Sequence, residues 1–377
     1  MKKLFIFALA LFAVVPAFAA QPVRVIVSED ISYDDNIYLK KARYGDKKDS
    51  FISTTRAGVD YKGQLPNSGL NLTAGALVGY NLYTRKPSKN NYWDALGTVE
   101  LANDNLKLGD RYLFTSDPAN SELTDRAKRM RNTVYASYQT SHDRLISFGL
   151  GVEDFYDRYY EGYMDYLNRN RFDASAQVFY NFNTKTNVFA EYTFSDIVYQ
   201  ENGSFNSVGH RVGLGINGQV APKVTGTAKV TYNMRDYSHD WRGASKHPDL
   251  FGYYAALTWK ATSRDVVKLS GERRMEETRF ENNRYFADTL IALSGTHKFN
   301  SKWSASLTLG WEDMDYARTT GTEKREDQLF TVRPQVDYMF KNWLMGSVWY
   351  QSRTRVSNRK AYEYENNKVG VSLKALF

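Results

Sequence analysis

The chain has 377 residues, a formal net charge of +8 and no Cys, which excludes thiolate metal sites, disulfides and thiol catalysis. Its mean hydropathy is strongly negative, and no segment beyond the first nineteen residues holds eighteen successive apolar residues, which excludes a helical membrane protein. Yet 15% of the residues are aromatic, mainly 28 Tyr and 21 Phe. A hydrophilic chain rich in aromatic residues is typical of a transmembrane β-barrel, with a polar lumen, an apolar outer band and aromatic girdles.

The N-terminus has the three parts of a secretory signal. A basic start, Met1-Lys-Lys3, precedes an apolar run from Leu4 to Val15 and the small-x-small sequence Ala17-Phe-Ala19. The apolar run is shorter than a membrane-spanning helix requires. We therefore expect residues 1–19 to be removed as a signal peptide and residues 20–377 to form an outer-membrane β-barrel. No Cys follows the cleavage site, which argues against a lipoprotein.

Segments with a period of two recur along the remaining chain. In the segment 70–82, Leu, Ala, Val and Tyr at even positions alternate with Asn, Thr and Gly at most odd positions, and segments 172–180, 211–217, 225–233 and 303–311 alternate similarly. Repeated dyads of about ten residues are the signature of transmembrane strands. The first four predicted strands are Val23–Tyr38, Phe51–Gly63, Leu70–Tyr83 and Tyr92–Leu101.

The connections between these segments alternate in length. Short joints rich in Asn, Asp, Ser, Pro and Lys, which are turn-forming residues, alternate with longer polar segments. This pattern predicts short periplasmic turns and long extracellular loops on one antiparallel up-and-down barrel. Counting segments gives about eighteen strands, with sixteen as the alternative. The predicted turns are 141–144, 183–186, 221–223, 262–264, 300–302 and 341–342, and the predicted loops are 116–129, 158–168, 238–248, 319–326 and 357–361.

The last strand indicates which face of the barrel wall contacts lipid and which faces the lumen. From Lys368 onward, Val369, Val371 and Phe377 fall on one face, whereas Lys368 and Lys374 fall on the other. An aromatic final residue on an alternating strand resembles the closing strand of bacterial outer-membrane barrels, where it is the assembly signal. We therefore predict that Phe377 faces lipid, that both lysines face the lumen, and that this strand pairs with the first one.

The same alternation assigns an excess of basic residues to the lumen. Such an excess would favour anions or acidic sugars, but inward charges also form salt-bridged ladders that hold the barrel wall, and both interpretations stay open. Inward aromatic residues, such as Tyr135, Phe179, Tyr254 and Trp349, either provide a stacking surface for carbohydrate or fill space. The predicted pore-lining residues are Arg211, Lys229, Arg235, Lys268, Arg274, Arg333, Arg353, Arg355, Lys368 and Lys374.

Nothing in the sequence indicates an enzyme. His239 and His247 share one predicted loop with Asp240 and Asp249, the only plausible acid–base or metal grouping, and its spacing matches no zinc motif. We therefore expect no catalytic residues, no metal and no cofactor. The basic residues are spread around the predicted wall rather than gathered on one face, which argues against nucleic-acid binding.

Several stretches resemble one known family. Tyr33-Asp-Asp-Asn-Ile-Tyr38 looks like the first-strand motif of the "putative β-barrel porin 2" family, and the segments 213–216, 253–260 and 366–373 are similar in style. The resemblance covers nearly the whole chain after the signal. It implies an outer-membrane porin inserted by the barrel assembly machinery, often linked to exopolysaccharide export beside a polysaccharide export lipoprotein and a periplasmic copolymerase.

Two functions of different classes follow from these features. The first is a channel, the outer-membrane conduit or accessory of an export system for exopolysaccharide or acidic oligosaccharide. The second is a closed structural or adhesin-like barrel whose lumen is plugged and whose extracellular loops carry the function. The sequence alone leaves both open.

Overall fold

The computed structural model describes residues 22–41, 47–118, 121–122, 126–141, 144–201, 203–240, 244–279, 283–317 and 323–377. The predicted signal peptide, residues 1–19, lies outside these ranges. Parts of the predicted turn 141–144 and of the predicted loops 116–129, 238–248 and 319–326 also lie outside them. Within them, no helix is long and apolar enough to cross a membrane.

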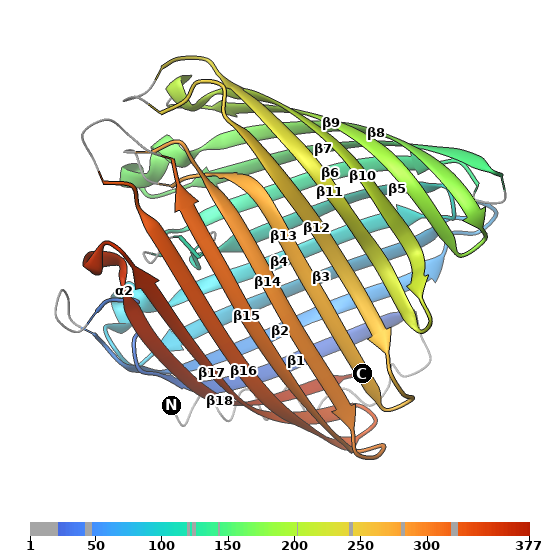
Figure 1. Ribbon diagram of the computed structural model, residues 1–377. Helices are drawn as coiled ribbons and strands as arrows, with labels where there is room; N and C mark the ends of the chain where they lie inside the picture. The colour runs from blue at the N-terminus through green and yellow to red at the C-terminus, as the bar shows by residue number, and fades with distance from the viewer. Residues whose placement is uncertain are drawn as a thin grey trace.

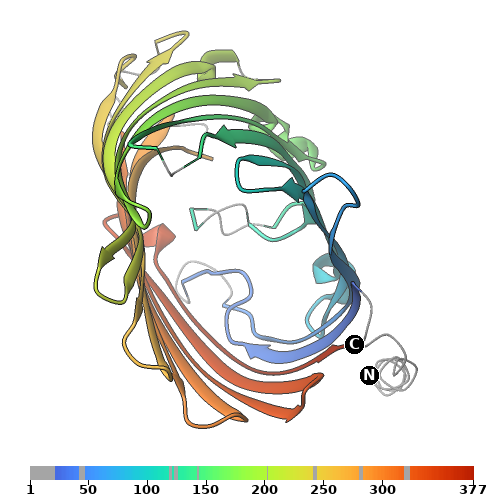
Figure 2. The ribbon, with the colours of Figure 1, turned by 90° about the vertical axis from the view of Figure 1, so that its right-hand side faces the viewer.

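Eighteen antiparallel strands form one closed barrel, in which each strand pairs with its neighbours in sequence and β1 pairs with both β2 and β18 (Figures 1 and 2). The prediction of eighteen strands is confirmed, and the alternative of sixteen is wrong. The strands are β1 Val23–Asp34, β2 Ser50–Gln64, β3 Asn71–Tyr83, β4 Tyr92–Ala102, β5 Leu106–Thr115, β6 Arg129–Gln139, β7 Ile146–Tyr159, β8 Arg169–Asn183, β9 Thr186–Tyr199, β10 Ser207–Ala221, β11 Val224–Tyr237, β12 Asp249–Lys260, β13 Asp265–Glu277, β14 Tyr285–Lys298, β15 Trp303–Tyr316, β16 Glu326–Lys341, β17 Leu344–Ser357 and β18 Tyr364–Leu376.

The period of two separates the two faces of the wall. On β17, the side chains of Val348 and Val356 are 57% and 50% exposed on the outer face, whereas Trp349 between them turns inward and is 7% exposed. Because a barrel in lipid must satisfy every backbone group through its neighbours, closure of β1 on β18 removes the last open edge.

Short and long connections lie at opposite ends of the barrel (Figure 1). Joints such as 184–185, 222–223 and 342–343 have two residues, whereas the other end carries long loops with short helices. The predicted loops and turns are confirmed wherever they fall in the described residues. We assign the short turns to the periplasm and the loops to the cell exterior. The helices are α2 (Pro87–Asn90), η1 (Gly162–Leu167), η2 (Gly203–Phe205) and η3 (Lys360–Tyr362).

The first-strand motif closes the extracellular end of the β1–β18 seam. The Asp34 carboxylate accepts hydrogen bonds from Asn366 Nδ2 (2.7 Å) and the Asn36 backbone (2.9 Å), and the Asp35 carboxylate accepts the backbone N–H of Asn367 (2.7 Å). Asn36 in turn donates to the carbonyl of Glu365 (2.7 Å). The stretch 33–38 and the stretch 366–373 therefore meet in space, and their acid and amide side chains hold the two ends of the chain together.

Between β5 and β6, Ser121 and Glu122 lie against the far wall of the barrel. Ser121 donates to Glu312 on β15, and the Glu122 carboxylate accepts from Thr278 Oγ1 and the Arg279 backbone in the β13–β14 loop. These two residues therefore contact strands and loops distant from β5 and β6.

Candidate functional site

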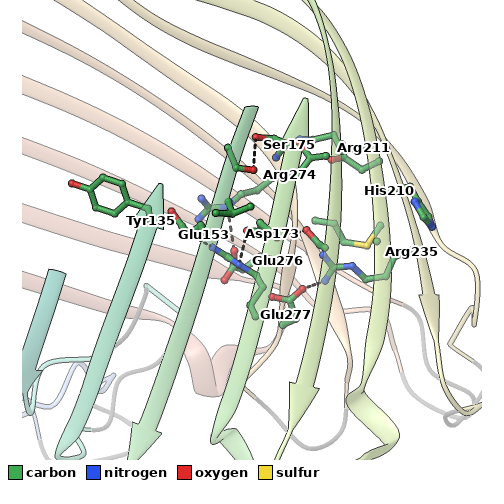
Figure 3. A pocket seen from close by; sticks show the side chains of 18 of the residues that line it. Tyr135, Glu153, Asp173, Ser175, His210, Arg211, Arg235, Arg274, Glu276 and Glu277 are labelled. Carbon is green, nitrogen blue, oxygen red and sulfur yellow. Dashed lines mark hydrogen bonds and ion pairs between the residues drawn. The ribbon is translucent and has the colours of Figure 1, made fainter. Parts of the chain in front are cut away.

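The lumen holds a cavity of about 570 Å³ against the wall from β5 to β13. Charged side chains of both signs line it and point toward one another (Figure 3). Its lining includes Arg171, Arg211, Arg235 and Arg274 opposite Glu153, Asp173, Glu272, Glu276 and Glu277.

This side of the wall is a ladder of ion pairs. Arg274 reaches Glu272 and Glu276, each at 3.2 Å, and Asp288 at 3.4 Å. Glu191 is shared by Lys229 at 2.6 Å and Arg211 at 3.6 Å, and Glu277 by Arg235 and Arg169. Arg171 lies 3.0 Å from both Glu153 and Asp173. Because each of these cations has carboxylates beside it, the ladder itself adds little net positive charge.

At the extracellular end of the ladder, one carboxylate serves three arginines. Asp157 on β7 is fully buried, with Arg131 at 3.1 Å, Arg129 at 3.5 Å and Arg279 at 3.9 Å. Arg279 belongs to the β13–β14 loop, so this pairing joins two distant parts of the barrel mouth.

Replacing Asp157 with Asn is expected to destabilise the barrel by about 3–5 kcal/mol, because it leaves buried guanidinium groups without a counter-charge. The midpoint of urea unfolding, followed by heat-modifiable mobility of the refolded protein, measures the change. Asp154→Asn is the matched control, since Asp154 lies on the same strand and is exposed on the outer face. Equal midpoints for the two variants would show that Asp157 is not a central counter-ion.

A second lumen sector, on β16 to β18, holds cations against aromatic rings instead of carboxylates. The Trp349 ring lies against Gly370, where an added Cβ would come within 2.5 Å of it. Arg333 and Lys368 lie 4.8 and 5.6 Å from the centre of the indole, which donates its N–H to Asp30 (3.1 Å). Cation–π contacts of this kind stabilise a charge without neutralising it.

Three cations of this sector form no ion pair among the described residues. Arg353 lies 6.0 Å from the centre of the Tyr364 ring. Among the described residues, Arg333, Arg353 and Lys368 have no carboxylate within ion-pair distance, so we call these three residues with Trp349 and Tyr364 the cationic strip. The strip concentrates positive potential on the side of the lumen that lacks the ladder.

All ten predicted basic residues occupy inward-facing strand positions, but their surroundings differ. Arg211, Lys229, Arg235 and Arg274 belong to the ladder, Arg333, Arg353 and Lys368 to the strip, and Lys268 and Lys374 are exposed toward the periplasmic end. Arg355 is 1% exposed and its Nη1 lies 3.5 Å from the carbonyl of Glu122, so it does not face open lumen. Their role in selecting solutes stays a prediction.

The inward aromatic residues offer no continuous stacking surface. Phe179 and Trp349 are 5% and 7% exposed, and cations cover Tyr135 and Tyr254: Arg111 lies 4.9 Å from the first ring centre and Lys229 5.5 Å from the second. These rings fill space and carry cations, which supports the second of the two sequence interpretations.

The histidine-containing loop is not assembled into a site. His247 pairs with Asp236, Asp249 accepts from Tyr232, and the carbonyl of His239 accepts from Arg284. In the ranges that the structure describes, no three His, Asp or Glu side chains are grouped to hold a metal ion.

Sequence reasoning missed the residues at the extracellular mouth. Asp157 lies four positions after Glu153 on β7, so the period of two places both side chains on the inner face. This alternation could have identified Asp157 as an inward carboxylate. Glu122 lies in a loop, where no period exists, so nothing in its neighbourhood indicates that it reaches the opposite wall.

The sequence profile of the family described as "Putative beta-barrel porin 2" matches residues 23–377. The chain belongs to this family. No curated protein matches the porin in sequence. Its fold is similar to solved outer-membrane proteins: OpdK of Pseudomonas aeruginosa (10% identity, TM-score 0.50, covering 94% of this chain and 99% of that chain) and OccAB4 of Acinetobacter baumannii (11%, 0.51, 96% and 100%). At such low identity the likeness shows the fold alone, and with the family it identifies an outer-membrane β-barrel porin.

Proposed function

We propose that this porin is a passive channel for acidic saccharides and serves as the outer-membrane conduit, or an accessory, of exopolysaccharide export. The cationic strip is the observation that carries the proposal. Arg333, Arg353 and Lys368 face the lumen, and among the described residues none of them has a carboxylate within ion-pair distance. Such charge in a low-dielectric wall raises the local concentration of anionic solutes.

The ladder and the cationic strip have different roles in the passage of a saccharide. The ladder is neutral overall and hydrophilic, so it admits water and sugar hydroxyl groups without retaining either sign of charge. The strip attracts the carboxylates of uronic acid residues, and its cations, held on aromatic rings, exchange partners as the saccharide moves. No step requires a metal, a cofactor or energy input.

The route to the membrane is part of the proposal. Residues 1–19 would direct secretion across the inner membrane, and Phe377 would present the last strand to the barrel assembly machinery. A polysaccharide export lipoprotein would dock on the periplasmic turns, because these turns are short and leave no dedicated periplasmic domain among the described residues.

One observation favours the second candidate, a closed barrel. Glu122, between β5 and β6, is anchored on the far wall by Thr278 Oγ1 (2.5 Å) and the Arg279 backbone N–H (2.7 Å). If this contact never opens, the lumen is plugged and the extracellular loops would carry the function.

Electrical recording from the purified, folded full chain in planar bilayers separates the two candidates. A stable current whose reversal potential in a KCl gradient shows anion preference supports the channel. No current from protein with native heat-modifiable mobility would establish the closed barrel. Proteoliposomes then test the solute: labelled digalacturonate should enter several-fold faster than labelled maltose, a neutral disaccharide. Equal rates would contradict the preference for acidic saccharides.

The role in export needs a measurement in cells. Deleting the gene should reduce acidic polysaccharide at the cell surface, measured as uronic acid released by washing, and a plasmid copy should restore it. An unchanged amount would remove the export role and leave a general anion channel.

A further inference from the structure

The β5 edge of the lumen cavity differs from the rest of its wall. Lys107 and Arg111 of β5 both line the cavity, and both side chains are exposed. Among the described residues, neither has a carboxylate within ion-pair distance. The other arginines that line the cavity each lie beside at least one carboxylate. The cavity therefore carries its unpaired positive charge at the β5 edge.

A stack of three residues positions Arg111. Gly109 has no side chain, and the Tyr135 ring lies across it, because a Cβ added at position 109 would come within 2.4 Å of the phenol. The Tyr135 hydroxyl group donates to Glu100 of β4 (2.6 Å), which holds the ring in place. The guanidinium carbon of Arg111 lies 4.9 Å from the ring centre. A guanidinium group stacked on an aromatic ring keeps its N–H edge free for a carboxylate.

The surroundings of the two cations leave space for a ligand. The residues that pair with them in register on β4 and β6 are small and uncharged: Ala102, Ser137, Thr98 and Thr133. A bound anion therefore displaces no existing counter-ion from Lys107 or Arg111. Ser137 is exposed and also lines the cavity, so its hydroxyl group is within the space that a sugar would occupy. In Figure 3, Tyr135 lies at the edge of the cavity, away from Arg235.

We propose that Arg111 and Lys107 form a binding subsite for the uronate residues of an acidic oligosaccharide at the β5 edge of the cavity. The inference deepens the proposed function, on which its ligand class rests, and adds a place where the saccharide is held. Arg111 binds one carboxylate through two parallel N–H donors. Lys107, four residues along the strand and so about 13 Å away, binds the carboxylate of another uronate residue in the same oligosaccharide.

The cavity favours a saccharide over a small inorganic anion. Its volume of about 570 Å³ is that of a site for an organic ligand. Across from the two cations, the carboxylates of Glu153 and Asp173 also line the cavity and are acceptors for sugar hydroxyl groups. A uronate residue uses both kinds of group, whereas an inorganic anion uses the cations alone. The cationic strip lies on other strands, β16 to β18, so the strip attracts anions to the lumen and the subsite holds the saccharide.

Binding to the folded full chain in detergent micelles tests the subsite without requiring an open channel. Equilibrium dialysis with labelled trigalacturonate measures the dissociation constant. Arg111→Lys keeps the charge but loses the paired N–H donors, so it should raise this constant about tenfold, and Lys107→Gln should raise it about threefold. Lys260→Gln is the matched control, since Lys260 is an exposed lysine on the inner face of β12 and outside the cavity lining. The subsite is refuted if trigalacturonate does not bind, or binds equally to Arg111→Lys and the unchanged porin.

A change in the backbone wall tests the stack while keeping every charge. Gly109→Ala places a Cβ where the Tyr135 ring lies, so it should displace the ring and Arg111 and raise the dissociation constant about fivefold. Gly295→Ala is the matched control, because a Cβ added there meets no atom within 4 Å. Equal binding by these two variants would contradict the positioning of Arg111 by the stack. If Arg111→Lys does not fold, Lys107→Gln and Gly109→Ala still decide the matter.

A neutral competitor tests the role of the carboxylates. Maltotriose, which has the hydroxyl groups but no charge, should not displace labelled trigalacturonate at a tenfold excess over it, about 1.4 kcal/mol of preference. Displacement as strong as that by unlabelled trigalacturonate would show that the subsite does not recognise carboxylates.

The outcomes separate this inference from the proposed function. If the channel prefers anions and admits digalacturonate faster than maltose, while Arg111→Lys binds trigalacturonate as the unchanged porin does, the function stands and the subsite is wrong. If the porin binds trigalacturonate through Arg111 but passes neither current nor saccharide, the subsite is confirmed and the channel function fails.

Discussion

Replacing Arg333 and Lys368 together with Glu is expected to reverse the selectivity of the porin from anions to cations. The two side chains come from β16 and β18, the strands that flank Trp349 on β17, and neither has a carboxylate within ion-pair distance among the described residues. Two reversals place negative charge where the unpaired positive charge now stands. The anion-to-cation permeability ratio should fall by about tenfold or more. The reversal potential in a KCl gradient measures this ratio.

The change in selectivity is expected to depend on where the substituted charge lies, not on the net charge of the protein. Arg333→Glu alone should shift the reversal potential, whereas Arg158→Glu, the same substitution at an exposed outward-facing position on β7, should leave it unchanged. High salt should reduce the shift, because screening shortens the range of the field. Equal shifts for both single variants would show that the strip does not govern selectivity.

Much of the fold is predictable from the sequence because each strand carries its own signal. The dyads around Val348 and Val371 separate the two faces without reference to any other strand, and turn residues such as Asn183 and Pro222 mark the short joints. Strand number follows from counting. The closing pair, β1 with β18, follows from the requirement that no edge remains open in lipid.

The surroundings of a lumen residue are less predictable, because they depend on other strands and on loops. Arg353 and Arg355 share one face of β17 and differ by two positions. Arg353 lies beside the Tyr364 ring, whereas Arg355 is 1% exposed and lies against the carbonyl of Glu122. Alternation gives the face of a residue only. Pairing requires the register of the neighbouring strands, and burial requires the path of a loop that has no periodicity.

The distribution of charge explains how both sequence interpretations of the lumen apply. The salt-bridged ladder occupies the wall from β6 to β14, where Glu191 and Glu277 each pair with two cations. The cationic strip lies on β16 to β18. A count of inward charges averages these two sectors and so predicts a weak, diffuse field. The strip instead gathers three cations without ion pairs on one side of the lumen, which is why the double substitution is expected to reverse the selectivity.

Deleting Phe377 is expected to lower the amount of folded porin in the outer membrane by about tenfold or more, because an unclosed barrel edge is not tolerated in lipid. The backbone N–H and carbonyl of Phe377 both bond to Val25 of β1, each at 2.9 Å, and its ring stacks on Trp343 with the centres 5.2 Å apart. The residue thus fixes the periplasmic end of the seam that Asp34 and Asn366 fix at the other end.

Two further variants test whether assembly requires the aromatic ring of Phe377 or only the apolar contact area that this side chain buries. Phe377→Tyr keeps the ring and should restore assembly, whereas Phe340→Ala removes a half-exposed outward ring at the same end and should have little effect. Heat-modifiable protein in outer-membrane fractions measures assembly in cells, and refolding into detergent micelles measures intrinsic folding. A deletion variant that refolds in micelles but fails in cells identifies Phe377 as the assembly signal. Failure in both would make it a structural clamp of the β1–β18 seam, and normal assembly in cells would contradict either role.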